Sequence, residues 1–181
     1  GERKVTSLGL RKGEIRICQH DPAWLLEADQ VCGEIRKLAG CYLVDVQHVG
    51  STSVPGLPAK PILDFAIGVD DTEDLGELRS CLTAMGYLDR GLGAGSIGHL
   101  LVREIEKDVR TQHVHILEHG SEHWFHYTLM RDHLISDDEN RARLRDLKQE
   151  LVRSEVTRAE YQRQKSLLVQ ELLLRIVGKH A

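Results

Sequence analysis

The apolar residues near the start of the chain follow helical spacing after Asp21 and strand-like spacing on either side of that stretch. Asp21 can cap a helix and Pro22 suits its first position, and apolar residues then recur every three or four positions as far as Gly40. This pattern predicts an amphipathic helix over residues 22–39, ended by Gly40 in the left-handed conformation. Alternating or continuous apolar runs predict short strands at residues 14–18, 42–49 and 62–69.

The middle of the chain predicts one further helix and a hairpin. Thr72 can cap a helix whose leucines share one face, and Gly86 supplies its stop. Strand-like segments follow at 97–106 and 111–118, and the charged turn EKDVR between them suits a hairpin. We therefore expect an antiparallel pair of strands in this part of the chain.

From Ser121 onward the pattern is helical almost to the end. Ser121 and either Asp137 or Asp138 are capping residues, and one later helix carries leucines on a single face: Leu144, Leu147 and Leu151. Strands with one early crossover helix, followed by helices in a row, predict an α+β fold. In this fold helices cover one side of a mixed β-sheet, and the C-terminal third is helical.

Length and composition are those of one water-soluble domain. We expect a single domain over residues 1–181, mainly sheet with two helices in 1–120 and helical in 121–181. Hydrophobic residues make up 41% and charged residues 29%, and the apolar runs are far too short to span a membrane. The four cysteines include no CxxC pair and the first residues do not resemble a signal peptide, so a cytoplasmic location is expected.

Net charge bears on the class of partner. The formal net charge is −4, which argues against a surface built to neutralise a nucleic-acid backbone. A nucleotide or another phosphorylated small molecule is the better expectation, with neither nucleic acid nor a membrane as partner. The pattern does not specify an oligomeric state.

A loop rich in glycine, serine and proline joins two of the predicted strands, which we expect to be neighbours in the sheet. Gly50 permits close backbone approach, and the hydroxyls of residues 51–53 can join free amides at a helix start to hold phosphate oxygens. Lys60 adds a mobile positive charge, and Asp64 can hold a divalent ion that bridges those oxygens. The alternative is a loop that only connects strands, with Asp64 as a capping or core-edge carboxylate.

Several short motifs stand in order between roughly residues 20 and 175. They are Asp21-Pro22-x-Trp24, His48 followed by Gly50-Ser51-Thr52, Pro55-Gly56-Leu57, Ala59-Lys60-Pro61, Asp64, His113-x-His115, Arg131-Asp132, and Tyr161 with Lys165. This series resembles the GrpB family, which is grouped with the polymerase-beta-like nucleotidyltransferases. The resemblance implies a nucleotidyltransferase-like fold. It also implies a protein that binds a nucleoside triphosphate and transfers a nucleotidyl group to an unidentified acceptor.

The resemblance further implies roles for single residues. Asp64 would hold a divalent metal ion, Mg²⁺ or Mn²⁺, with His113 and His115 as further ligands or as acid-base catalysts. Lys60 and Lys165 would meet the negative charge that develops during transfer. The full set of phosphate-binding or substrate-binding positions would be His48, Gly50, Ser51, Thr52, Lys60, Arg131, Tyr161 and Lys165.

Ala66 departs from the chemistry of nucleotidyl transfer by two metals, which uses two carboxylates at alternate positions of one strand. Asp64 has no such partner, and His113 and His115 stand where a third acidic residue would fall. Imidazoles bind a transition metal or act as a general base near neutral pH. These residues therefore indicate a one-metal or acid-base site rather than a two-magnesium site. The plainer alternative is that both histidines line a half-exposed strand.

Three functional classes therefore stay open. Besides the transferase, the chain fits a histidine-centred small-molecule enzyme, or a non-catalytic nucleotide-binding or accessory module, for example one associated with dephospho-coenzyme A kinase. Ala66 favours the module. The chain lacks the GxxxxGK phosphate loop and the GxSxG elbow, which disfavours a P-loop kinase and a serine hydrolase. The charged run from Arg141 to Lys165 is interpreted as a solvated helical face, with Lys165 as the exception.

Overall fold

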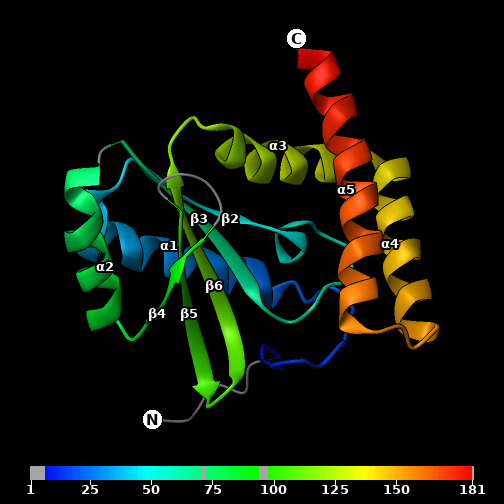
Figure 1. The fold of residues 1–181 in the computed structure, drawn as a ribbon, viewed down its shortest axis with the longest axis horizontal. Coiled ribbons are helices and arrows are strands. Elements are labelled where there is room, and N and C mark those ends of the chain that lie inside the picture. The colour runs from blue at the N-terminus through cyan, green and yellow to red at the C-terminus, as the bar shows by residue number, and fades with distance from the viewer. Residues whose placement is uncertain (1–6, 71, 94–97, 181) are drawn as a thin grey trace.

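A mixed β-sheet with helices on both sides forms the described part of the chain, residues 7–70, 72–93 and 98–180 of a computed structural model (Figure 1). Six strands belong to the sheet in these residues: β1 (Leu10–Arg11), β2 (Asp45–Val49), β3 (Leu63–Val69), β4 (Leu88–Leu92), β5 (His99–Glu106) and β6 (Val109–Glu118). Their order is β2-β3-β6-β5-β4, with β1 paired to β6. Because β3 and β6 run parallel and the other pairs antiparallel, the predicted mixed sheet is confirmed.

Helices follow the sheet in the C-terminal third. The helices of the described residues are α1 (Ala23–Ala39), α2 (Leu75–Ala84), α3 (Glu122–Ser136), α4 (Asp138–Arg153) and α5 (Arg158–His180). Three short 3-10 segments accompany them: η1 (Gly40–Tyr42), η2 (Ser51–Ser53) and η3 (Thr72–Asp74). In Figure 1, α4 and α5 lie side by side near the end of α3. The prediction of a helical C-terminal third is confirmed. Within the described ranges, no helix combines the length and the apolar character that crossing a membrane requires.

The two faces of β3 carry different chemistry because side chains alternate along a strand. Phe65 and Ile67 are fully buried in the main core cluster, which α1 and α2 help to form. Asp64 and Ala66 lie on the other face, where Ala66 packs with Trp124 of α3. The prediction that helices cover only one side of the sheet is therefore wrong, since α3 also covers part of the second face.

The expected pairings of neighbouring strands are confirmed. β2 and β3 pair antiparallel, and β2 begins at Asp45 because the chain before it forms η1. β5 and β6 form the predicted hairpin, and Asp108 has a φ of 64° in its turn. Residue 97, with which the first strand of that hairpin is predicted to begin, lies outside the described residues.

Two strand assignments differ from the sequence pattern. Residues 14–18 form no strand, and Cys18 makes only an isolated bridge with Ala59. The guanidinium of Arg16 donates to the carbonyl oxygen of Gly9 at 2.8 Å, so this segment folds back instead of extending along the sheet. β4 is not indicated by the pattern, because its sequence LDRGL contains aspartate and glycine, which strands disfavour.

Helix ends agree with the predictions in part. Gly86 has a φ of 104° after α2, and Asp137 is the residue that caps α4. Gly40 is not left-handed, since its φ is −58° and the chain continues into η1. Thr72 begins η3, and α2 follows that 3-10 turn with Asp74 as its N-cap, so the predicted cap is two residues early.

Candidate functional site

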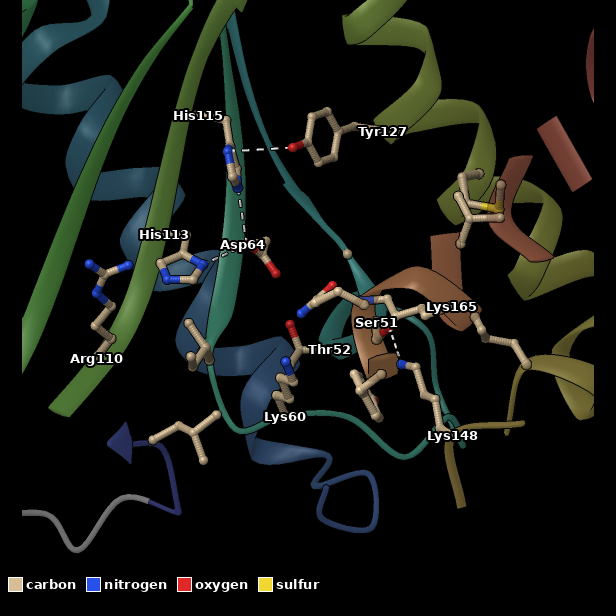
Figure 2. Close-up of a pocket in the computed structure, with 18 of the residues that line it drawn as sticks. Ser51, Thr52, Lys60, Asp64, Arg110, His113, His115, Tyr127, Lys148 and Lys165 are labelled. Atoms are coloured by element: carbon tan, nitrogen blue, oxygen red, sulfur yellow. Dashed lines mark hydrogen bonds and ion pairs between the residues drawn. The ribbon is translucent and has the colours of Figure 1, made fainter. Parts of the chain in front are cut away.

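A cavity of about 590 Å³ opens between the second face of the sheet, η2 and the three C-terminal helices (Figure 2). Lysine and arginine dominate its charged lining: Arg11, Lys12, Lys60, Arg110, Arg131, Lys148, Arg158 and Lys165. The carboxylates of the lining are Glu14 and Asp64. Because the whole chain has a net charge of −4, this concentration of positive charge is local. Such a cavity attracts anions.

Asp64, His113 and His115, called the triad below, meet on the sheet side of this cavity. Parallel pairing places Asp64 of β3 opposite His113 of β6 and Ala66 opposite His115. The Asp64 Oδ1 atom lies 3.4 Å from His113 Nδ1 and 3.1 Å from His115 Nε2. One ligand atom of each residue lies within 4.8 Å of the other two. The structure thus brings together the three residues that the sequence singles out for catalysis and metal binding.

The groups around the triad keep Asp64 ionised and hold the histidine rings in place. Burial opposes ionisation of Asp64, but hydrogen bonds from the two histidines outweigh it and hold the pKa of that carboxyl well below its ordinary value. The Tyr127 hydroxyl lies 3.4 Å from His115 Nδ1, and the two rings stack with centroids 5.0 Å apart. His113 Nε2 is buried without a hydrogen-bond partner in the described part of the chain. A charged carboxylate between two held imidazoles suits a cation.

Gly50 lets the loop approach the triad. Its φ of 73° lies in the left-handed region, and a Cβ atom there would be 2.7 Å from Asp64 Oδ2. The backbone N–H of Ser53 donates to the Gly50 carbonyl oxygen at 3.1 Å and its hydroxyl donates to the same oxygen at 2.5 Å. These bonds hold η2 beside Asp64, with Ser51 and Thr52 on the cavity wall.

His48 lies on the opposite face of the sheet from the triad. Its ring packs against Phe65 at 5.7 Å, and it is not among the residues that line the cavity. Burial lowers the pKa of His48 to about 4, against a smaller opposing effect of Asp64. Its Nε2 atom lies 2.8 Å from Thr52 Oγ1. The structure therefore places His48 as a support for the loop.

Three lysines, Lys60, Lys148 and Lys165, form a lysine cluster across the cavity from Asp64 (Figure 2). Burial, and to a smaller extent the charge of Lys165, lowers the pKa of Lys60 to about 8. Lys148 is only 2% exposed, and burial followed by the charges of the other two lysines holds its pKa well below the ordinary value. Burial also lowers the pKa of Lys165. The cluster is strained by repulsion that a bound anion would relieve.

Lys148 is the site residue that the sequence reading misses. Its ammonium donates to Ser51 Oγ and, at 3.3 Å, to the carbonyl oxygen of Pro58, and no carboxylate pairs with it in the described residues. The prediction of a solvated helical face is wrong here, because Lys148 shares the buried face of α4 with Leu144 and Leu151. That spacing is a usable signal, since a lysine on the apolar side of a helix must point at something specific.

Arg131 and Tyr161 line the cavity and also hold its walls. The Arg131 guanidinium donates to Gln47 Oε1 at 2.6 Å and to the carbonyl oxygen of His48 at 3.1 Å, which ties α3 to β2. The buried ring of Tyr161 lies under Lys60, with the ammonium 4.7 Å from the ring centroid. Both residues therefore orient neighbours besides lining the cavity.

The donor set fits one metal ion. The nitrogen and oxygen ligands of the triad are those that first-row transition metals accept. Ala66, where a second carboxylate would stand in a two-metal site, is fully buried in a cluster with Trp124. A charged side chain at that position would face the indole instead of the cavity. The residues present therefore do not fit a second ion beside Asp64.

Comparisons with known proteins agree with one another. The family model described as GrpB protein matches residues 14–175. A UPF0157 protein from Halalkalibacterium halodurans is 30% identical over 175 residues, which cover 96% of this chain and 88% of that protein. A UPF0157 protein from Streptomyces coelicolor is 44% identical over 108 residues, which cover 60% of this chain and 55% of that protein, about half of its length.

A solved structure and one shorter match complete the comparisons. The crystal structure of conserved protein GrpB from Enterococcus faecalis has a TM-score of 0.81 at 24% identity, and the match covers 91% of this chain and 99% of that chain. This likeness concerns the fold. A dephospho-CoA kinase from Mycolicibacterium paratuberculosis is 32% identical over 81 residues, which cover 43% of this chain and 20% of that kinase.

Proposed function

The chain belongs to the GrpB family, and from that premise we propose that its cavity binds a nucleoside triphosphate with one divalent metal ion and transfers the nucleotidyl group to a second molecule. The observation that carries the proposal is the arrangement across the cavity. A carboxylate with two imidazoles lies on one side, three lysines lie on the other, and the Gly50 loop lies between them. A polyphosphate bound to a metal ion matches this distribution of charge.

The triad is the proposed metal site. Asp64 Oδ1, His113 Nδ1 and His115 Nε2 already converge. Two imidazoles favour Mn²⁺ over Mg²⁺, because Mg²⁺ prefers oxygen ligands. When bound, the ion would polarise a phosphoryl oxygen and neutralise its charge. The Tyr127 hydroxyl at His115 would keep that ring in place.

The lysine cluster and η2 are the proposed phosphate site. Lys148 and Ser51 already contact each other, and Lys60 and Lys165 repel one another until an anion arrives. In the proposed reaction a deprotonated oxygen atom of the acceptor forms a bond to the α-phosphorus, while the bond to the bridging oxygen breaks and pyrophosphate leaves with the electron pair. The lysines would hold phosphate oxygens beside the reacting phosphorus and offset the negative charge that gathers there during transfer.

A second candidate is a non-catalytic module that binds a nucleotide or another phosphorylated small molecule. Ala66 favours it, because the strand carries one carboxylate instead of two. The partial likeness to a dephospho-CoA kinase suits an accessory role beside an enzyme of that kind. In either role we place the protein in the cytoplasm, where triphosphates are abundant and free thiols stay reduced.

Isothermal titration calorimetry with each of the four nucleoside triphosphates tests the proposal, with Mn²⁺, with Mg²⁺ and with neither. We expect one triphosphate to bind in a metal-dependent way, and Asp64→Ala to remove the metal dependence. Lys148→Met should weaken binding at least tenfold by deleting one charged phosphate contact, which corresponds to about 1.4 kcal/mol. Lys37→Met, at an exposed lysine of α1 on the far side of the sheet, is the matched control and should change nothing.

Other outcomes distinguish the remaining classes. Binding of a triphosphate without metal dependence and without pyrophosphate release would favour the accessory module over the transferase. Binding of Mn²⁺ at the triad with no response to any triphosphate would contradict both and favour a histidine-centred enzyme for another substrate.

A further inference from the structure

Apolar side chains line the cavity on the side of the C-terminal helices. They form what we call the apolar wall: Met130, Leu134, Leu144, Val169 and Leu173. Leu134 and Leu144 are buried in the cluster between α3, α4 and α5, whereas Met130, Val169 and Leu173 stay half-buried. Half-buried apolar side chains that face a cavity are stabilised when an apolar ligand removes them from water.

The apolar wall begins one helical turn from two members of the lysine cluster. On α4, Leu144 precedes Lys148 by four residues, and on α5, Val169 follows Lys165 by four. Residues four apart lie on the same face of a helix. Each helix therefore presents a cationic position and an apolar position to the same cavity. Figure 2 shows the cationic side, with Lys148 and Lys165 across from Asp64.

The apolar wall has no hydrogen-bond partners for the polar edge of a nucleobase. Its five side chains carry no nitrogen or oxygen atom. Arg131 stands between Met130 and Leu134 in the sequence, but its guanidinium is already bonded to Gln47, to the His48 carbonyl and to Asp132. A polar edge buried here without partners would cost binding free energy. A hydrocarbon group suits this surface better than a base does.

We propose that the apolar wall is an acceptor subsite, which takes the hydrocarbon part of a phosphate monoester whose phosphate lies beside Lys148 and Lys165. This inference rests on the proposed function, because it assigns a chemical class to the second molecule of the transfer. The acceptor is amphiphilic, with an anionic head at the lysine cluster and an apolar tail along α3 and α5. The triphosphate then occupies the side of the cavity nearer the triad.

A series of alkyl phosphates tests the subsite directly. Methyl, butyl and hexyl phosphate are titrated into the protein by calorimetry without nucleotide or metal. Each added methylene group that reaches the wall should tighten binding about fourfold. Methyl phosphate measures the head-group site alone, so the dependence on chain length isolates the wall.

Two nearly isosteric variants locate the effect. Val169→Thr and Met130→Gln keep the size of the side chain but make it polar, so the gain from butyl to hexyl phosphate should disappear while methyl phosphate binds as before. Leu174→Gln is the matched control, because Leu174 is on the same helix but is 76% exposed and does not line the cavity. It should keep the full dependence on chain length.

The failures of the two proposals are distinct. If methyl phosphate binds and longer chains bind no better, the acceptor subsite is wrong while the proposed function stands. If adenosine monophosphate binds more tightly than hexyl phosphate and the wall variants weaken it, the wall holds a base and the subsite is likewise wrong. If neither methyl phosphate nor any triphosphate binds, the proposed function itself fails.

Discussion

Successive side chains of β3 point to two faces of the sheet that differ in character. One face packs against α1 and α2, and the other faces the cavity. Phe65 and Ile67 are fully buried among apolar side chains on the first face. Asp64, their neighbour, faces a cavity whose charged lining is mostly cationic. The first face gains free energy from burial, whereas the second holds charges whose pKa values are displaced by burial and by each other. The comparison locates stability on one face and the candidate chemistry on the other.

Two unfavourable features lie on the cavity face. Lys148 is a buried lysine without a carboxylate partner in the described residues, and His113 Nε2 is a buried atom without a hydrogen bond there. Both features cost free energy in the free protein. Real proteins concentrate such local conflicts at functional sites. A ligand that supplies an anion and a cation would resolve them together.

The largest expected difference between the two faces is in the free energy of unfolding, and substitutions of two adjacent residues of β3 measure it. Phe65→Ala should cost about 3–5 kcal/mol in free energy of unfolding, because it opens a cavity in a sealed core. Asp64→Ala should cost less, about 1–3 kcal/mol, since it removes hydrogen bonds from two histidines at a side chain that is 26% exposed, but it should abolish metal binding. Urea denaturation measures the first quantity, and calorimetry with Mn²⁺ measures the second. Equal losses of stability in the two variants would contradict the division between the faces.

The sequence predicts the second face less well than the first, for a physical reason. Apolar periodicity indicates which residues are buried, and it correctly predicts the helix beginning near Pro22 and the pairing of β2 with β3. It does not specify which polar residues meet, because that depends on the parallel register of β3 and β6. The grouping of Asp64 with two histidines could be proposed only from a family resemblance.

Lys148 and His48 illustrate two errors in predicting the site from the sequence: a site residue that is missed, and a predicted one that lies on the other face of the sheet. Lys148 sits in a run of mixed charge that is typical of a solvated helix, and only its spacing from Leu144 and Leu151 indicates burial. His48 directly precedes the loop motif in the chain, but the alternation of β2 turns it to the face of Phe65. Proximity in sequence is thus a poor guide to which side of a sheet a residue serves.

Two glycines of the loop between β2 and β3 test whether the approach of this loop supports the triad. Gly50 and Gly56 have φ values of 73° and 80°, so alanine at either should cost about 1–2 kcal/mol in backbone strain. A Cβ atom at Gly50 would also meet Asp64 Oδ2 at 2.7 Å, whereas one at Gly56 meets nothing within 4 Å. Gly50→Ala should therefore weaken Mn²⁺ binding by displacing Asp64, while Gly56→Ala leaves it unchanged. The same Mn²⁺ affinity in both variants would show that the approach of the loop does not matter to the triad.

The smallest expected effect concerns pH and Lys60. Burial and the charge of Lys165 lower the pKa of Lys60 from 10.5 to about 8 in the folded protein, so between these values the unfolded chain binds more protons. The free energy of unfolding should therefore rise with pH from about 8 to 10.5, because the buried charge is lost. Binding of methyl phosphate should change in the opposite direction, weakening by up to about tenfold across the same window, because one charged phosphate contact is lost as the ammonium loses its proton. Lys60→Arg should reduce that pH dependence, because a guanidinium stays charged throughout. A wild-type affinity that does not change across the window would remove Lys60 from the phosphate site, since the anion would then be held by groups that keep their charge.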